Sequence, residues 1–404
     1  MSPHIAFDIQ FEIIKRIPVK SLLRFRSVCK AWKSLIDSSE FIAGYSVPNT
    51  QPQHLLMKYE VADRQVTGFK CVCFVDDDTF PRQTFTPTVP PLLEELYLSR
   101  IIESSHGVLC FYGFYHPKKG DLWPNYLIDM ALLWNPSIRK STAVVVPKVI
   151  SAHFSSVLGF GVCPNTCDPM LVYVTFISTW SNPKVISCIP CQVLVFKLSS
   201  GEWECLSGNL PRKSIGFTWS SAVIGQFIYW FAYDRIDENG GLRNLIMAFD
   251  MVSDEFIEIA LPDSLAHLPD DLDHLPELAF SISKLRESLV VLEYTKNTSK
   301  HQVCGVWMME HGDPKWFTKL YTIEAPYERI ERTLGFSKSG KPIIEKDFDF
   351  FGHFDLEATL AVYEPCTEQI KDLEIHVTDN SVFVNSYTES LLLLHEEDGL
   401  IYSM

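Results

Sequence analysis

The stretch Ile17-Pro-Val-Lys-Ser-Leu-Leu-Arg-Phe-Arg-Ser-Val-Cys-Lys-Ala-Trp-Lys-Ser-Leu-Ile36 restarts a helical pattern directly after the proline that ends a first helix. Upstream, Ile9, Ile13 and Ile17 recur every four residues, which places them on one side of that first helix. In the second helical stretch, apolar side chains occupy more than half of the circumference and basic side chains the remainder. About 40 residues cannot cover this much apolar surface alone. The segment therefore predicts contact with a partner protein.

This order of residues closely resembles the F-box, the adaptor-binding motif of SCF-type ubiquitin ligases. The resemblance implies that apolar residues dock on a Skp-type adaptor. Nine residues are expected to divide between that contact and the packing of the helices, and the sequence alone does not make the division: Ile9, Ile13, Ile17, Pro18, Leu22, Leu23, Val28, Cys29 and Trp32. Such families usually open with Leu-Pro where this chain has Ile5-Ala6, and losing the preset φ angle of proline predicts weaker adaptor binding. Alternatively, the helices only cap the large domain.

The bulk composition is that of a globular protein with one small and one large domain. The chain has 404 residues, of which 47% are hydrophobic and 21% charged. It contains no run of about 18 apolar residues and no secretory leader pattern at its start. We therefore expect no membrane partner and a location in the cytoplasm, the nucleus or both, where the eleven cysteines stay reduced.

The net charge of −15 is unevenly distributed along the chain. Residues 1–47 contain seven basic and four acidic residues, a net charge of +3, and the remainder therefore carries −18. An acidic domain repels phosphate backbones, so we expect no nucleic-acid partner. A charged client would be basic, unless the acidity serves only to maintain solubility.

After residues 47–53, which have the composition of a linker, short β-type runs alternate with turn clusters. A repeat places aromatic or apolar residues seven positions apart across a polar turn: Phe196 and Trp203, Phe249 and Phe256, Tyr363 and Ile370. Trp307 to Trp316 gives a longer copy, and Trp134 a degenerate one. A second hairpin-like pair of runs precedes each copy, so the unit is a four-stranded blade, near the kelch-type blade in length.

The number of blades follows from these repeats. Five copies are visible, and Ser381–Leu394 begins a sixth that the strands near His54–Val75 can complete. Pairing the first strands with the last removes two exposed sheet edges. We therefore predict an α+β multidomain chain: a helical domain over 1–46, a linker over 47–53 and an all-β propeller of six blades over 54–404.

Three further motifs resemble plant F-box-associated domains, including the kelch-like and S-locus F-box groups: Leu133-Trp-Asn-Pro-Ser-Ile-Arg-Lys140, Leu158-Gly-Phe-Gly161 and Tyr387-Thr-Glu-Ser-Leu391. The resemblance implies a non-catalytic receptor that joins a client protein to the adaptor and, through it, to cullin. Two alternatives remain open. One is an adaptor-binding scaffold that assembles no ligase, and the other is a propeller metalloprotein.

The insertion Leu261–Leu278 is the first candidate for a client-binding element because it interrupts the blade rhythm. It joins acidic residues to leucines that we expect to be exposed, among them Leu265, and its centre is Asp270, Asp271, Leu272 and Asp273. The alternative is a short amphipathic helix that covers a blade edge. A second candidate is Glu60–Arg82, which contains Asp76-Asp77-Asp78.

The metal candidates are two cysteine pairs, Cys163 with Cys167 and Cys188 with Cys191, which suit zinc or are free thiols in or beside blade strands. A second group, Asp347, Asp349, His353 and Asp355, matches no calcium loop and is read as an acidic loop. No phosphate loop, nucleophile elbow or zinc-protease motif occurs. We therefore predict no catalytic residue, no metal and no cofactor.

Overall fold

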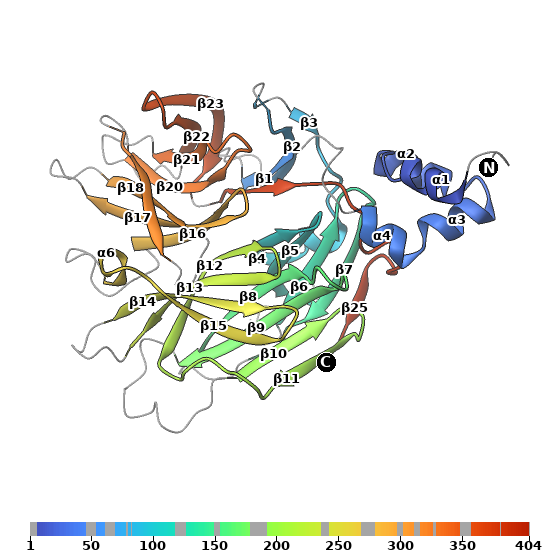
Figure 1. Ribbon diagram of the computed structural model, residues 1–404, viewed down its shortest axis with the longest axis horizontal. Helices are drawn as coiled ribbons and strands as arrows, with labels where there is room; N and C mark the ends of the chain where they lie inside the picture. The colour runs from blue at the N-terminus through green and yellow to red at the C-terminus, as the bar shows by residue number, and fades with distance from the viewer. Residues whose placement is uncertain are drawn as a thin grey trace.

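A small group of helices projects from one side of a larger body of β-sheets in the computed structural model (Figure 1). The structure describes residues 6–45, 54–60, 69–77, 80–81, 83–117, 127–148, 154–177, 192–235, 242–267, 279–296, 302–310, 316–325, 329–347, 357–379 and 381–403. Among the helices of these ranges, none combines the length and the apolar character that a bilayer crossing requires.

The N-terminal domain has four short helices: α1 (Phe7–Ile14), α2 (Val19–Phe25), α3 (Lys30–Ile36) and α4 (Ser39–Tyr45). Pro18 precedes α2, as expected for a residue that cannot continue α1. The second helical stretch predicted from the sequence is divided into two helices, because the chain breaks between α2 and α3. There Cys29 adopts an extended conformation, and its Sγ accepts a hydrogen bond from the Trp32 backbone N–H at 3.4 Å, which caps α3.

Six blades, each built on four antiparallel strands, form the propeller, which confirms the predicted blade number; one blade has a fifth strand, described below. From inner to outer strand, the blades are β4 (Leu96–Ser105), β5 (Val108–Tyr115), β6 (Ile128–Asn135) and β7 (Lys140–Val145); β8 (Phe154–Val162), β9 (Pro169–Ile177), β10 (Gln192–Lys197) and β11 (Glu202–Leu206); β12 (Ile215–Ile224), β13 (Phe227–Asp234), β14 (Arg243–Asp250) and β15 (Glu255–Ala260); β16 (Phe280–Leu285), β17 (Ser288–Lys296), β18 (Gln302–Met309) and β19 (Phe317–Ile323); β20 (Arg329–Phe336), β21 (Pro342–Asp347), β22 (Glu357–Glu364) and β23 (Gln369–Thr378); and β24 (Phe383–Tyr387), β1 (His54–Glu60), β2 (Phe69–Val75) and β3 (Gln83–Phe85). Two short helices, α5 (Pro91–Glu94) and α6 (Asp263–Ala266), lie in connections between blades.

The ring closes as the sequence predicts, because the first and last parts of the chain share one blade. Strand β24 pairs antiparallel with β1, from His54 opposite Tyr387 to Lys58 opposite Phe383. The inner strands β4, β8, β12, β16, β20 and β24 contact one another in that order around the ring. Every blade therefore has a neighbour on both sides.

The aromatic repeat corresponds to the pairing of the two outer strands in each blade. Phe196 lies opposite Trp203, Phe249 opposite Phe256, and Tyr363 opposite Ile370. The expected pairing of Trp307 with Trp316 is wrong. A bulge after Val306 places Trp307 opposite Lys319, and Trp316 precedes β19 with 60% of its surface exposed.

The connections of the propeller divide between two faces because successive strands run in opposite directions. One face, here called the turn face, has the tight turns that join the first to the second strand of a blade, such as His106–Gly107 and Gly225–Gln226. The opposite face, here called the loop face, anchors the long connections: Tyr115 to Ile128, Ile177 to Gln192, Ala260 to Phe280 and Asp347 to Glu357. The C-terminal end of β24 and the start of β1 lie at the turn face, so the helical domain attaches there.

Candidate functional site

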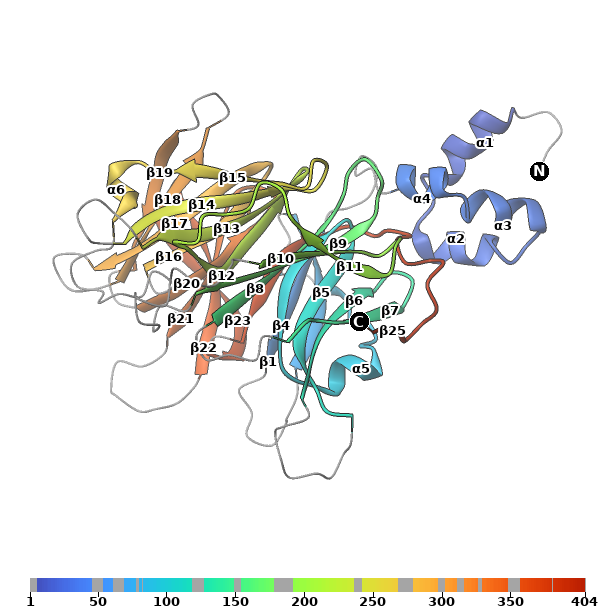
Figure 2. The same cartoon turned by 90° about the horizontal axis from the view of Figure 1, so that it is seen from below.

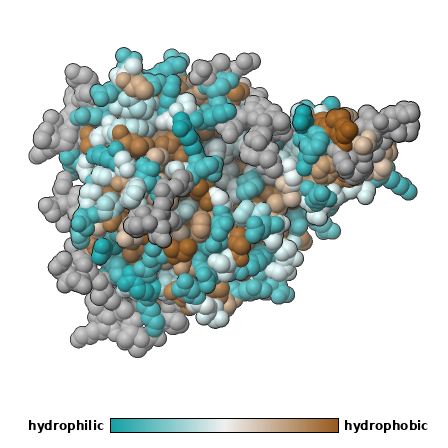
Figure 3. Space-filling model, viewed as in Figure 1, coloured by the Kyte–Doolittle hydropathy of each residue, from teal (hydrophilic) through white to brown (hydrophobic). Residues whose placement is uncertain are grey.

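Three apolar side chains of the helical domain are exposed to solvent. Ile9 and Ile13 on α1 are 56% and 52% exposed, and Val28 between α2 and α3 is 66% exposed. Ile9 and Ile13 are four residues apart and share one face of α1. Figure 3 shows hydrophobic residues at the surface of this projecting domain. Ile9 and Ile13 therefore form an exposed apolar pair on α1, and adjacent exposed apolar side chains of this kind can be covered by a partner.

The other sequence-predicted residues of this surface fall into three groups. Pro18 and Cys29 are exposed, and Ile17, Leu23 and Trp32 are partly buried. Leu22 is fully buried and packs in the hydrophobic core, so of the two roles that the sequence left open for it, this structure places it in the internal packing of the helices. In this conformation a partner protein cannot contact the Leu22 side chain.

The ring of Trp32 is well packed, but its indole nitrogen has no hydrogen-bond partner among the described residues. Its ring packs edge-on against Phe25, with centroids 4.8 Å apart. Its indole Nε1 is buried and has no hydrogen-bond partner among the residues that the structure describes. A buried donor without an acceptor costs about 1–3 kcal/mol, so this N–H is a local source of instability in the helical domain.

A C-terminal segment that the sequence analysis did not identify as a domain contact fixes the helical domain to the propeller. We call residues 388–403 the strap. Its leucines at positions 391–394 are buried in one hydrophobic cluster with Ile36 and Phe41 of the helical domain and Phe160 of the propeller. Glu389 Oε2 accepts a hydrogen bond from the Val19 backbone N–H at 3.2 Å, and His395 Nε2 lies 2.9 Å from the Asp37 carbonyl oxygen.

One buried amide connects the strap to the propeller. Asn135 at the end of β6 is fully buried, and its Nδ2 donates to the Ser390 carbonyl oxygen at 3.1 Å, to Ser390 Oγ at 3.0 Å and to the Leu392 carbonyl oxygen at 2.8 Å. Its Oδ1 accepts from the Ser137 backbone N–H at 3.0 Å, and Ser137 Oγ lies 2.5 Å from Tyr387 OH. The Trp-Asn-Pro-Ser motif therefore has a structural role in holding the strap.

The strap ends as an additional strand. Strand β25 (Leu400–Tyr402) pairs in parallel with β7 and makes the fifth strand of that blade. The Gly399 backbone N–H donates to the Ser141 carbonyl oxygen at 2.9 Å, and the Tyr402 ring packs on Phe196 with centroids 5.5 Å apart. The sequence did not predict β25, because a strand of only three residues is too short to show a pattern and depends on its pairing partner.

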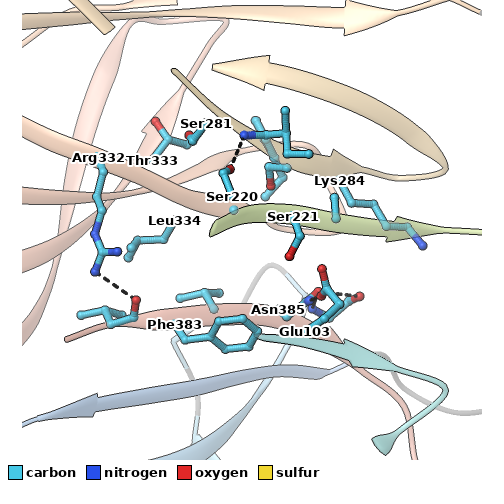
Figure 4. A pocket seen from close by; sticks show the side chains of 18 of the residues that line it. Glu103, Ser220, Ser221, Ser281, Lys284, Arg332, Thr333, Leu334, Phe383 and Asn385 are labelled. Carbon is cyan, nitrogen blue, oxygen red and sulfur yellow. Dashed lines mark hydrogen bonds between the residues drawn. The ribbon is translucent and has the colours of Figure 1, made fainter. Parts of the chain in front are cut away.

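The second candidate surface is the central cavity of the propeller, of about 1010 Å³ (Figure 4). Inner strands of five blades line it, and polar side chains join neighbouring blades along its wall. The Ile282 backbone N–H donates to Ser220 Oγ at 2.8 Å, and Arg332 donates to the Val382 carbonyl oxygen at 3.1 Å. A cavity of this size with convergent polar groups is typical of binding sites.

Glu103 is the most perturbed acid of this cavity. It is 5% exposed and accepts hydrogen bonds from the Ser104 backbone N–H at 2.9 Å and from Asn385 Nδ2 across the blade boundary. Burial raises the pKa of Glu103 to about 7, and the hydrogen bonds oppose that shift only in part. The carboxyl group therefore changes protonation near neutral pH.

The predicted client residues Asp270, Asp271, Leu272 and Asp273 lie outside the described residues. The described start of their insertion corrects one expectation. Leu265 on α6 is fully buried in a cluster with β16 and β17, and Asn244 Nδ2 donates to its carbonyl oxygen at 3.0 Å. Asp76 of the second candidate is also buried, and its carboxylate accepts the Lys338 backbone N–H at 2.9 and 3.0 Å.

Of the four cysteines of the zinc hypothesis, the structure describes Cys163 and Cys167. Cys163 is buried and Cys167 partly buried, and the Cys167 backbone N–H donates to the Cys163 carbonyl oxygen at 2.8 Å. Burial raises the pKa of the Cys167 thiol, which disfavours the thiolate that metal binding requires. Cys188, Cys191, Asp349, His353 and Asp355 lie outside the described residues. Within the described part of the chain, no three His, Cys, Asp or Glu side chains are grouped as a metal site.

Comparison with known proteins gives two matches to protein families. An F-box domain matches residues 4–43, and an F-box associated beta propeller domain matches residues 82–396. The Arabidopsis thaliana protein named "Putative F-box protein At1g47790" is 25% identical over 255 residues, which cover 63% of this chain and 58% of that relative. The chain thus spans less than two thirds of that protein. "Putative F-box protein At3g10240" of the same plant is 23% identical over 427 residues, covering 100% of this chain and 94% of the relative.

Among solved structures, TolB from Acinetobacter baumannii aligns with a TM-score of 0.41 at 7% identity, over 88% of this chain and 71% of TolB. This similarity is too low to support an argument about function.

Proposed function

Because this chain belongs to the F-box proteins that carry an F-box associated beta propeller domain, we propose that it is the substrate-recognition subunit of an SCF-type ubiquitin ligase. The helical domain would bind a Skp-type adaptor and, through it, cullin, and the propeller would bind a client protein. The observation that carries this proposal is the exposed apolar set Ile9, Ile13 and Val28 on a domain that matches the F-box. We further propose that the protein acts in the cytoplasm, the nucleus or both.

The mechanism is proximity and requires no bond chemistry by this chain. Holding a client lysine near a charged ubiquitin carrier raises the effective concentration of the two reactants. The strap supports this role because it packs between the helical domain and the propeller through buried leucines and the Asn135 hydrogen bonds. A fixed orientation between the two binding surfaces limits the positions that the client can reach.

The adaptor contact is tested by Ile13→Asp and Val28→Asp in the full chain. Burying one such side chain contributes about 1.5–3 kcal/mol, so each variant should weaken binding to a purified Skp-type adaptor by about tenfold or more in biolayer interferometry. The matched control is Ile257→Asp on the outer strand β15, where Ile257 is 40% exposed. Adaptor binding that is equal in wild type and both helical-domain variants would overturn the proposal.

An adaptor-binding scaffold that assembles no ligase is the second candidate. It is favoured by the start of α1, where Ala6 is the N-cap and gives no side-chain hydrogen bond to the first turn. The two candidates differ in one measurement. Reconstitution with adaptor, cullin and RING subunit should produce a complex of all components on size-exclusion chromatography if the chain is a ligase receptor. A stable complex with the adaptor that excludes cullin would favour the scaffold.

A further inference from the structure

The inner strand β4 contains a bulge at its loop-face end. Tyr97 lies opposite Phe114 and Arg100 opposite Tyr112, so Leu98 and Ser99 together face only Gly113 of β5. Leu98 adopts a φ of 50°, in the left-handed region that disfavours residues with a branched side chain. Strained backbone of this kind persists only where surrounding contacts impose it, and bulges often re-aim side chains beside binding sites.

Two neighbours of the bulge impose this conformation. A Cβ atom at Gly113 would lie 3.0 Å from the Tyr97 carbonyl oxygen and 3.2 Å from Ser99 Cα, so any larger residue would push the bulge outward by a few tenths of an ångström and glycine allows the close approach. On the neighbouring blade, Lys58 Nζ donates to the Ser99 carbonyl oxygen at 3.3 Å. Lys58 is only 5% exposed, so the fold buries an ammonium group to hold this carbonyl.

The strained conformation presents apolar side chains to solvent instead of burying them. Leu98 is 82% exposed, the highest value among the exposed large apolar side chains of the described residues, and Tyr97 is 57% exposed. Two residues further on, the Arg100 guanidinium lies over the Trp219 ring at 4.3 Å, and Trp219 lines the central cavity. Tyrosine, tryptophan and arginine are the residue types enriched where protein interfaces concentrate their binding energy.

The bulge lies away from the helical domain. Strand β4 follows α5, which is at the loop face, and Figure 2 shows α5 and the helices α1–α4 on opposite sides of this blade. A partner on the bulge therefore leaves the exposed Ile9, Ile13 and Val28 open to the adaptor.

The charges around the bulge indicate what kind of segment it accepts. Glu94 in α5 and Glu60 at the end of β1 are exposed. The ammonium of Lys58 is buried on the Ser99 carbonyl, and the guanidinium of Arg100, although exposed, stacks on Trp219. The propeller part of the chain carries a net charge of −18. We propose that Tyr97 and Leu98 are the docking point for the client, and that the client segment has an apolar residue flanked by lysine or arginine. This inference rests on the proposed function.

The test uses the full chain in complex with a Skp-type adaptor, probed on arrays of degenerate peptides. Each array places Leu, Phe or Trp between Lys/Arg, between Glu/Asp or between Ser/Gly positions. We expect wild type to prefer the Lys/Arg array, and Tyr97→Ala and Leu98→Asp to lower that signal about tenfold or more, the effect of losing one buried apolar anchor. Ile257→Asp, on an exposed outer strand, should retain it.

Leu98→Gly separates a binding role from a structural one. Glycine adopts positive φ without strain, so this variant should melt at the same or a higher temperature than wild type and still lose the Lys/Arg signal. An unchanged signal in Leu98→Gly, or equal binding to the Glu/Asp array, overturns the docking proposal. Retained adaptor binding in that case leaves the proposed function intact, whereas failure of wild type to bind the adaptor contradicts the proposed function itself.

Discussion

Replacing Asn135 by aspartate tests whether one buried amide holds the strap. The substitution keeps the size and the Oδ1 acceptor of the side chain but removes both N–H donors. An oxygen then faces the carbonyl oxygens of Ser390 and Leu392, which Asn135 Nδ2 contacts at 3.1 and 2.8 Å. The site is fully buried, so water does not replace the lost donors.

The expected magnitude follows from the two orphaned carbonyl groups. Each buried polar group without a partner costs about 1–3 kcal/mol, so Asn135→Asp should destabilise the strap by about 2–6 kcal/mol. This is a large part of the roughly 5–15 kcal/mol that stabilises a typical folded domain. Because protonation would restore one donor, the pKa of the new carboxyl group should be raised and the penalty should be smaller at pH 5 than at pH 8.

Hydrogen exchange followed by mass spectrometry measures the effect on the strap directly. Peptides from residues 388–403, and those from α2 and α3 that pack on Leu391–Leu394, should lose protection, while the outer strands β14 and β15 keep theirs. Asn209→Asp is the matched control, because Asn209 is exposed and its Nδ2 also donates to a backbone carbonyl, that of Phe256 at 3.1 Å. Equal protection of residues 388–403 in wild type and Asn135→Asp would refute the reasoning.

Three further predictions concern the cavity, the last strand and the thiols. Burial raises the pKa of Glu103 from 4.5 to about 7, so the native state binds this proton more tightly than the unfolded chain. Stability should therefore fall by roughly 3 kcal/mol between about pH 4.5 and 7, and Glu103→Gln should remove that slope in urea midpoints measured across this range. Truncation after Glu397 removes β25 and should lower the melting temperature and expose β7 to exchange; an unchanged β7 contradicts its role. Incubation with a zinc chelator should leave the melting temperature unchanged, and a drop would revive the cysteine site at Cys163 and Cys167.

Much of the propeller was predictable because its signals are local or repeated. Phe196 and Trp203 are seven positions apart and lie opposite each other on neighbouring strands. Turns of the same length give the same spacing in other blades, so the repeat locates the outer hairpin of each blade. The repeat fails at Trp307 because a bulge shifts the register there, and single residues inserted in a strand give no periodic signal.

The candidate binding surfaces were less predictable from the sequence. An apolar stripe does not show which of its members face the interior, so Leu22 and Ile13 had equal standing although the first is buried and the second is half exposed. Leu265 was expected to be exposed for the same reason, and its burial depends on strands β16 and β17, more than ten residues further along the chain. The bulge at Leu98 was missed because positive φ at a leucine has no sequence signature.

The sequence by itself determined the elements of this protein: a helical domain followed by repeated four-stranded units, and a ring that closes through its two ends. Hydrophobic spacing and turn residues act over a few positions, so they can be read without knowing the fold. The tertiary structure alone decided how the strap orients the helical domain through Asn135, which glutamate the cavity desolvates, and that Tyr97 and Leu98 point outward. Each of these depends on contacts between residues distant in the chain, where burial and hydrogen bonding are set by neighbours that only folding brings together.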